Sequence, residues 1–227
     1  GTPLWKRSTR SCMTIEKFLH SCLRVTVDGQ RLLTDPGSFC FMDGRVRPEQ
    51  LGPVDVILLT HEHSDHFDPD ALRTIVAAGT PIILAHPPLA EKVRAAGLPC
   101  EDIALGASRT IGAFTIEAMA TPHEPLPLPL PPHCGYLING ALYHPGDSLT
   151  FPIGRTVDVL ALPVAGPWCT AVAAVEAAKV LRPRIVLPIH DAIIQPFFID
   201  RLHWMIGEAL KGSGIEFRPV VLGAIEV

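Results

Sequence analysis

The feature of this sequence that most restricts its fold is a group of metal-ligand side chains directly after a short apolar strand. Residues 54–59 are mostly β-branched and aliphatic, which is typical of a buried strand, and the string HEHSDH follows at residues 61–66. In extended backbone, alternate side chains point the same way, so His61 and His63 can bind one metal ion. Asp65 and His66, on the following turn, can reach a second ion. Because buried imidazoles without partners cost several kcal/mol, the string predicts a metal centre and not a packing motif.

The rest of the pattern predicts two packed sheets with helices outside them. Strands are expected at 14–19, 22–27, 31–34, 81–85, 110–120, 136–143, 157–162, 184–189 and 215–221, and helices at 68–78, 87–96, 170–181 and 199–210. Asp28-Gly29 and Asn139-Gly140 are typical hairpin turns. Strands form hairpins early in each half and β–α units later, which argues against one doubly wound sheet. We expect one domain over residues 13–227, preceded by a leader or disordered segment at 1–12.

Composition and charge exclude several functions. The formal net charge is −4 and no block of basic residues occurs, so the footprint of a nucleic-acid-binding protein is missing. The two longest uncharged stretches, 125–146 and 159–175, contain prolines and do not resemble membrane helices. Six scattered cysteines without a C-x-x-C pair indicate free thiols in a reducing compartment. We therefore expect a soluble, cytoplasmic protein that binds a small molecule, with no nucleic acid and no membrane partner, and the sequence leaves a homo-oligomer open.

The string His61-x-His63-x-Asp65-His66 resembles the signature of the metallo-β-lactamase superfamily. Other segments match that family in order along the chain from residue 14 to about 193. They are the TDPG loop at 34–37, His123 after a strand, Gly146-Asp147-Ser148, and LPIH at 187–190. Within the superfamily, the sequence is most similar to the ascorbate-phosphate lactonase-like branch of small metal-dependent hydrolases. The resemblance implies an α+β fold, a four-layer αββα sandwich with a two-metal site on its edge.

The resemblance also implies a role for each of seven ligands. His61, His63 and His123 would hold one ion, and Asp65, His66 and His190 the other. Asp147 would bridge the two ions opposite a hydroxide that acts as the nucleophile. Asp65 and His190 are also the candidate catalytic residues, and Asp65 could take a proton from the attacking water. A ligand set without thiolate fits two Zn²⁺ ions, with Mn²⁺ or Fe²⁺ as alternatives.

Other residues near these motifs have open or secondary roles. His133 competes with His123 for its ligand position, although His123 is favoured because it directly follows a strand. Asp35 is expected to orient a ligand imidazole. His144 is expected to be an ordinary strand residue. Three further histidines are expected to be structural or to lie on the surface, with His86 also able to line the site: His20, His86 and His203.

Departures from neighbouring subfamilies narrow the activity. His63 stands where the flavodiiron branch has the glutamate of its H-x-E-x-D-H string. Asp147 stands where zinc β-lactamases usually have cysteine. Neither redox chemistry nor β-lactam hydrolysis is therefore expected. A dinuclear metal-dependent hydrolase of a small ester, lactone or phosphoester is the predicted function. The alternatives are a phosphodiesterase or nuclease of the same fold, and a non-catalytic metal-binding member.

Clues to the substrate are apolar. The stretch 122–132 alternates proline with leucine and predicts a stiff extended loop, which could be either a substrate wall or a rigid surface loop. Several apolar side chains are expected on loops near the ligands: Phe39, Phe41, Met42, Phe151 and Trp168. No cluster of Arg or Lys lies near the motifs, so an uncharged or weakly polar substrate is favoured over a phosphate monoester.

Overall fold

Two seven-stranded sheets form the centre of the computed structural model, which describes residues 12–227. The first sheet has the order β14-β1-β2-β3-β4-β5-β6. Its strands are β1 (Met13–Lys17), β2 (Leu23–Val27), β3 (Gln30–Thr34), β4 (Val56–Leu59), β5 (Ile82–Ala85), β6 (Glu101–Asp102) and β14 (Gly223–Glu226). β14, β1, β2 and β3 pair antiparallel, and β3 to β6 pair parallel.

The second sheet has the order β13-β12-β11-β10-β9-β8-β7. Its strands are β7 (Ser108–Ile111), β8 (Phe114–Met119), β9 (Gly135–Ile138), β10 (Leu142–His144), β11 (Val159–Pro163), β12 (Ile185–Ile189) and β13 (Glu216–Phe217). Its antiparallel part runs from β7 to β10 and its parallel part from β10 to β13. Both sheets are thus built the same way, from an antiparallel half and a parallel half.

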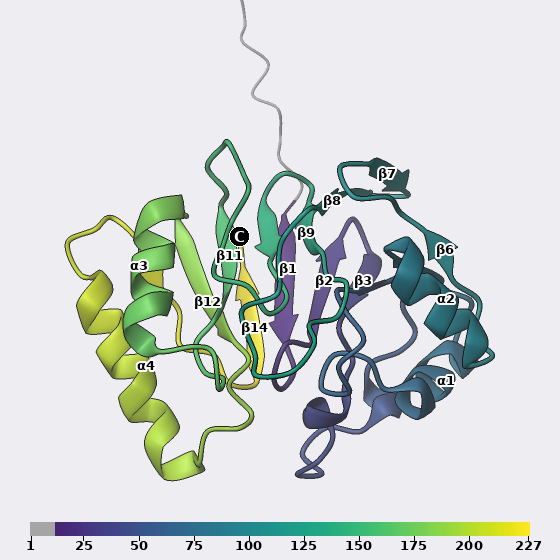
Figure 1. Cartoon of the computed structure of the whole chain (residues 1–227), viewed down its shortest axis with the longest axis horizontal. Coiled ribbons are helices and arrows are strands. Elements are labelled where there is room, and N and C mark those ends of the chain that lie inside the picture. Colours follow the sequence, from purple (N-terminus) through teal and green to yellow (C-terminus); the bar gives the residue numbers. More distant parts are fainter. Residues whose placement is uncertain (1–11) are drawn as a thin grey trace, which may run out of the picture.

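Helices cover the outer face of each sheet, which confirms the predicted αββα sandwich (Figure 1). α1 (Pro69–Ala77) and α2 (Pro87–Ala95) lie outside the first sheet, and α3 (Ala171–Leu181) and α4 (Pro196–Leu210) outside the second. Short 3-10 helices η1 (Ser38–Cys40) and η2 (Pro48–Gln50) follow β3. Local signals begin these helices: the Asp68 carboxylate caps α1 by accepting from two backbone N–H groups, and Pro69 occupies its first turn.

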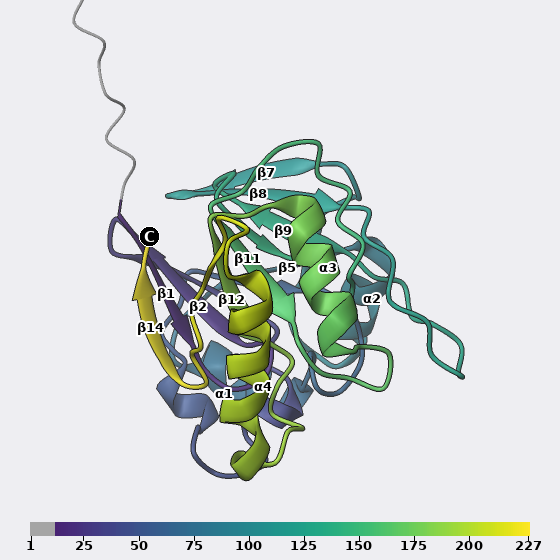
Figure 2. The ribbon, with the colours of Figure 1, turned by 90° about the vertical axis from the view of Figure 1, so that its left-hand side faces the viewer.

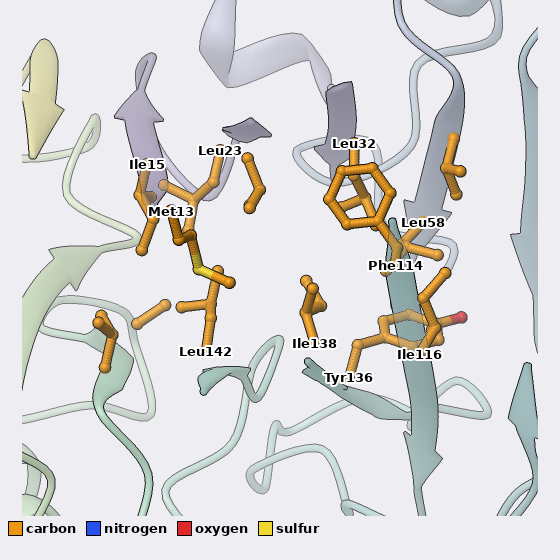
Figure 3. Packing of buried hydrophobic residues seen from close by; sticks show 14 of the residues in the cluster. Met13, Ile15, Leu23, Leu32, Leu58, Phe114, Ile116, Tyr136, Ile138 and Leu142 are labelled. Atoms are coloured by element: carbon orange, nitrogen blue, oxygen red, sulfur yellow. The ribbon is translucent and has the colours of Figure 1, made fainter. Parts of the chain in front are cut away.

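The main hydrophobic core lies between the two sheets (Figure 3). Met13, Ile15, Leu23, Leu32 and Leu58 from the first sheet face Phe114, Ile116, Tyr136, Ile138 and Leu142 from the second. All of these side chains are at most 5% exposed. The one polar group among them is satisfied, since the Tyr136 hydroxyl donates to the Leu59 carbonyl oxygen across the two sheets. Burial on this scale holds the strand ends of both sheets in a fixed relation.

Three predicted elements differ from the observed ones. The strand expected at 110–120 is a hairpin, because Gly112 adopts a left-handed φ of 53° and turns the chain between β7 and β8. The final strand expected at 215–221 is two short strands in different sheets: β13 pairs with β12, and β14 pairs with β1. α4 begins at Pro196, not at residue 199. The predicted Asn139-Gly140 turn is confirmed, with φ values of 52° and 62° that suit a hairpin.

The described part of the chain has unpaired cysteines and no helix that could cross a membrane. The predicted leader, residues 1–12, lies outside the described residues except for Cys12. No helix within residues 12–227 combines the length and hydropathy needed to cross a bilayer. The cysteines in this range are unpaired, and four of them are buried. Free thiols are therefore confirmed for the described chain, with Cys12 exposed and Cys100 half-buried.

Candidate metal centre

All seven predicted ligands lie on loops that follow the carboxyl ends of strands, at one edge of the sandwich. The string at residues 61–66 follows β4, His123 follows β8, Asp147 follows β10 and His190 follows β12. Parallel strands end at the same edge of a sheet, and the two packed sheets bring their edges together. Residues that are far apart in the sequence therefore meet in space.

The first group of potential ligands consists of His61, His63, His123 and Asp147. One donor atom from each residue lies within 4.8 Å of the others. His63 Nδ1 is 3.0 Å from His61 Nε2 and 3.3 Å from His123 Nε2. This is the set that the sequence assigned to one ion, completed by the bridging carboxylate.

The second group consists of His20, Asp65, His66 and His190, again with donor atoms within 4.8 Å of one another. Asp65 Oδ2 is 3.0 Å from His20 Nε2, 3.5 Å from His66 Nε2 and 3.4 Å from His190 Nε2. The three residues predicted for the second ion are brought together. His20 joins them and is fully buried. The sequence analysis expected this residue to be structural or to lie on the surface.

Asp147 lies between the two groups. Its Oδ2 atom is 3.6 Å from His61 Nε2, 3.5 Å from His123 Nε2 and 3.2 Å from His190 Nε2. Its Oδ1 atom is 2.9 Å from His66 Nε2. The carboxylate thus reaches imidazoles of both groups, as a bridging residue must.

Three of the predicted ligand histidines are oriented through the ring nitrogen that faces away from the centre. His66 Nδ1–H donates to Asp35 Oδ2 at 2.8 Å, and His190 Nδ1–H donates to the Ala165 carbonyl oxygen at 2.7 Å. His123 Nδ1–H donates to the Glu124 carbonyl oxygen at 2.6 Å. Such contacts fix the tautomer and leave Nε2 free to bind a metal.

Asp35 orients one histidine of each group, whereas the sequence predicted that it would orient one ligand imidazole. Besides accepting from His66, Asp35 Oδ2 accepts from the Thr60 hydroxyl at 2.6 Å, and Thr60 Oγ1 lies 3.0 Å from His61 Nδ1. One buried carboxylate therefore orients a histidine from each group. A glycine permits this packing, because a Cβ atom on Gly37 would lie 2.0 Å from the Asp65 carbonyl carbon.

The donor set fits divalent cations, judged by its unsatisfied atoms. Three atoms at the middle of the cluster are buried and form no hydrogen bond of acceptable geometry: His66 Nε2, His190 Nε2 and Asp147 Oδ1. His66 Nε2 and Asp147 Oδ1 are 2.9 Å apart, yet neither atom forms a hydrogen bond. Unpaired buried polar atoms are costly, so their convergence indicates a site for positive charge.

The pKa values of the histidines also indicate a site for positive charge. Burial alone would lower the pKa of His190, but the Asp147 carboxylate outweighs burial and raises this pKa to about 9. Burial would likewise lower the pKa of His66, which Asp147 raises well above its usual value. Burial lowers the pKa of His61 well below its usual value, and His66 acts in the same direction. The carboxylates therefore attract positive charge into a region that is closed to water.

His133, which competes with His123 in the sequence, and His144 both use their ring nitrogens for hydrogen bonds with backbone groups. His133 Nδ1–H donates to the Thr121 carbonyl oxygen at 2.8 Å, and His133 Nε2 accepts from the Asp147 backbone N–H at 3.0 Å. His144 Nε2–H donates to the Ser21 carbonyl oxygen, and its Nδ1 accepts from the Gly146 backbone N–H. Both rings hold the loop that carries Asp147, and neither has a nitrogen left for a metal.

His86 and His203 lie outside the two ligand groups, and some of the predicted apolar residues lie next to these groups. His86 begins α2 as its N-cap, and His203 Nε2 lies 3.4 Å from Asp191. Two of the predicted apolar residues contact the metal centre, since the Phe39 ring lies 5.2 Å from His20 and the Trp168 ring 5.2 Å from His190. Phe151 packs against Tyr143 in the core outside the second sheet instead.

Comparison with known proteins agrees with this geometry. The profile of a family described as "Beta-lactamase superfamily domain" matches residues 14–190, which include every predicted ligand. The chain belongs to this family. Protein Rv0786c of Mycobacterium tuberculosis is 33% identical over 192 residues, covering 81% of this chain and 86% of the relative. A UPF0173 metal-dependent hydrolase of Opitutus terrae is 31% identical over 194 residues, covering 78% and 84%.

Two solved structures share the fold. Igni18, a metallo hydrolase from Ignicoccus hospitalis, superimposes with a TM-score of 0.74 at 21% identity, covering 96% of this chain and 99% of that one. The metallo-β-lactamase fold protein YhfI from Bacillus subtilis gives a TM-score of 0.72 at 19% identity, covering 96% and 100%. The αββα architecture of this β-lactamase superfamily member is thus that of its structural neighbours.

Proposed function

We propose that this metal-dependent hydrolase of the β-lactamase superfamily uses two divalent cations, zinc first among them, to hydrolyse an ester, lactone or phosphoester bond in a small, largely apolar molecule. The observation that carries the proposal is the meeting of two ligand groups at Asp147, at the edge where both sheets end. A relative from Opitutus terrae is named a metal-dependent hydrolase, which agrees with it.

Each residue of the centre has a defined part in this proposal. His61, His63 and His123 would hold one cation, Asp65, His66 and His190 the other, and Asp147 would bind both. When bound, such cations lower the pKa of coordinated water and neutralise negative charge that develops on the substrate oxygen. Asp35, Thr60 and the backbone carbonyls keep the imidazoles in place, so the chain itself spends no free energy on ordering them during turnover.

The two candidate catalytic residues differ in what their surroundings favour. Burial would raise the pKa of Asp65, but the adjacent imidazoles of His190, His20 and His66 outweigh burial and hold this pKa well below its usual range. A carboxylate in such surroundings stays ionised, which suits a metal ligand and makes it a weak proton acceptor. His190 has its Nδ1 committed to the Ala165 carbonyl, so Nε2 is the atom available at the centre.

The approach to the centre is bordered by apolar side chains. Trp168 is half-buried, and its ring lies 5.2 Å from that of His190 and 6.1 Å from that of His123. A cavity of about 370 Å³ is lined by Phe39, whose ring contacts that of His20, and by Met42, Asp43, Ala192, Ile193 and Gln195. The apolar part of a substrate would bind in this cavity while its reactive bond lies at the metals.

Cationic side chains near the centre are committed to other carboxylates. Lys92 pairs with Glu62, the residue between His61 and His63, and Arg45 pairs with Asp43 at 2.6 Å. A phosphate monoester would therefore find no free arginine or lysine among these residues. This supports an uncharged or weakly polar substrate over a phosphate monoester or a nucleic acid.

Metal content and a substrate panel test the proposal together. Protein expressed with zinc should contain about two ions per chain and hydrolyse chromogenic esters, lactones or phosphotriesters. Asp147→Ala should lose metal and activity, whereas Asp200→Ala, an exposed carboxylate on α4, should keep both. Absence of metal in the wild-type protein would refute the proposal. Activity on RNA or bis-aryl phosphate alone would favour the phosphodiesterase alternative, and two bound ions without any hydrolysis the non-catalytic one.

Variation of the acyl chain tests the apolar cavity separately. Ile193 is 42% exposed on the cavity wall, so Ile193→Ser should cost about 1 kcal/mol of binding, or roughly a fivefold higher KM, for a long-chain ester. The KM for an acetate ester should stay unchanged. Val180→Ser on α3, 84% exposed, is the matched control and should affect neither substrate. Equal effects of Ile193→Ser on short and long esters would show that the chain binds elsewhere.

A further inference from the structure

His20 is the residue of the second group that the sequence pattern did not assign. It lies on the loop between β1 and β2, in the first sheet, while His190 belongs to the second. Its ring is fully buried, 4.1 Å from the ring of His190 and 5.6 Å from that of His66. Its Nε2 atom is 3.0 Å from Asp65 Oδ2, which is hydrogen-bond distance.

The other side of the His20 ring separates it from the predicted ligands. His61, His66, His123 and His190 each have an acceptor for Nδ1–H, whereas His20 Nδ1 is buried and has no hydrogen-bond partner. If Nε2 bound a metal, Nδ1 would carry the proton and leave a donor unsatisfied in the interior. A neutral ring with its proton on Nε2 leaves only an acceptor unpaired and gives Asp65 a hydrogen bond.

We propose that His20 is a positioning residue of the metal centre, which donates its Nε2–H to Asp65 Oδ2 and thereby holds that carboxylate in place for the second cation. The inference rests on the proposed two-metal function. A carboxylate oxygen has more than one acceptor direction, so the hydrogen bond leaves Asp65 able to bind a cation.

The backbone around His20 is built to keep the ring there. The chain is left-handed at His20, with φ of 61°, and its carbonyl oxygen accepts the backbone N–H of His190 at 3.2 Å. The next carbonyl, that of Ser21, accepts from His144 Nε2–H at 2.9 Å and from the Thr34 hydroxyl at 3.2 Å. One turn of the first sheet is therefore bonded to the loop of a ligand in the second sheet. An energetically unfavourable φ at this point is consistent with a site where position is critical.

Zinc affinity distinguishes a donor from a ligand. In His20→Gln the side-chain amide can still donate to Asp65. His20→Phe keeps an aromatic ring at this position but removes the N–H donor. We expect His20→Phe to weaken the binding of one of the two zinc ions by about 10–100-fold and to leave the other unchanged. His20→Gln should stay close to the wild type. His86→Phe, which removes a buried histidine outside both groups, is the control and should bind zinc normally.

The measurement is a titration of purified protein with zinc against a chromophoric chelator, with thermal unfolding to verify folding. If His20→Phe does not fold, His20→Met removes the donor with a more flexible side chain. Two normal zinc affinities in the non-donor variant would overturn the inference while leaving the proposed function intact. Absence of zinc binding in the wild-type protein would remove both.

The protonated nitrogen of His20 gives a second test without relying on affinity. Long-range ¹H–¹⁵N spectra of the zinc-loaded protein report which ring nitrogen carries the proton, and the missing signal in His20→Gln assigns it. We expect a neutral His20 with its proton on Nε2. A proton on Nδ1, together with loss of zinc in His20→Gln, would show that His20 is a ligand and would refute the positioning role.

Discussion

A buried ion pair directly behind the metal centre gives the sharpest prediction about stability. Lys17 is fully buried, and its Nζ donates to Asp191 Oδ2 at 2.6 Å and to the Val220 carbonyl oxygen at 3.0 Å. Lys17→Met retains the apolar stem and removes the charge. Among residues 12–227, it leaves the Asp191 carboxylate, 1% exposed, with His203 Nε2 at 3.4 Å as its one remaining ion-pair partner. Breaking one half of a buried pair costs about 3–5 kcal/mol, and partial compensation by His203 places our expectation near 3 kcal/mol.

The assay is urea unfolding at neutral pH, followed by circular dichroism, with the same substitution in an exposed pair as control. Lys179, 40% exposed on α3, pairs with Glu176 three residues earlier, so Lys179→Met should lower the free energy of unfolding by less than about 1 kcal/mol. A loss for Lys17→Met as small as that of the control would refute the reasoning. Adding Asp191→Leu to Lys17→Met should recover about half of the loss or more, because no unpaired charge then remains.

The same pair predicts a pH dependence. Burial would raise the pKa of Asp191, but Lys17 and His203 outweigh burial and lower it below its usual value. A carboxylate whose pKa is lowered by folding stabilises the protein above its unfolded pKa of about 4, and this contribution is lost as the pH falls through the folded value. The difference in stability between wild type and Lys17→Met should therefore shrink below about pH 4. A difference that stays constant down to pH 3 would contradict this assignment.

Three further predictions concern the metal centre and the proline-rich loop. His123→Ala should lose one of two bound metal ions, whereas His133→Ala, which removes the acceptor for the Asp147 backbone N–H and the donor to the Thr121 carbonyl, should keep both with weaker affinity; elemental analysis decides, and the reverse order would exchange the two roles. Acidification from about pH 7.5 to about pH 5 should release metal, since ligand imidazoles must be unprotonated to bind, and retention of both ions after gel filtration at the lower pH would contradict this. Leu128, 70% exposed on the loop, should tolerate serine with a change below about 0.5 kcal/mol in unfolding free energy; a larger loss would mean that the loop packs on another surface.

Local signals were sufficient for much of the fold. The Asn139-Gly140 turn, the Asp68-Pro69 helix start and the apolar run before His61 each depend on the chemistry of a few neighbouring residues, and each occurs as predicted. The αββα arrangement followed from the order of hairpins and β–α units, and from the resemblance. Figure 2, which views the second sheet from its helical side, shows how α3 and α4 pack together over that sheet, as the pattern of strands and helices implied.

The ligand string was equally local. His61, His63, Asp65 and His66 occupy six consecutive positions, so their proximity is a property of the chain itself. The distant members, His123, Asp147 and His190, were assigned because they follow strands in the order that the family requires. The structure brings them together with the string, and their role as ligands stays a prediction until metal content is measured.

Only the tertiary structure decided which other residues join the centre and how the chain ends are paired. His20 carries no motif and gains its place because the fold brings its ring to Asp65 and because the His190 backbone N–H bonds to its carbonyl oxygen. β14 pairs with β1 at a separation of some two hundred residues, and Lys17 meets Asp191 across the two sheets. The reason is physical: hydrogen bonds and burial between strands depend on where the sheets bring residues together, and a sequence read in windows records no such distances. Chemistry held in consecutive residues could be predicted, whereas chemistry assembled by the packing of the two sheets could not.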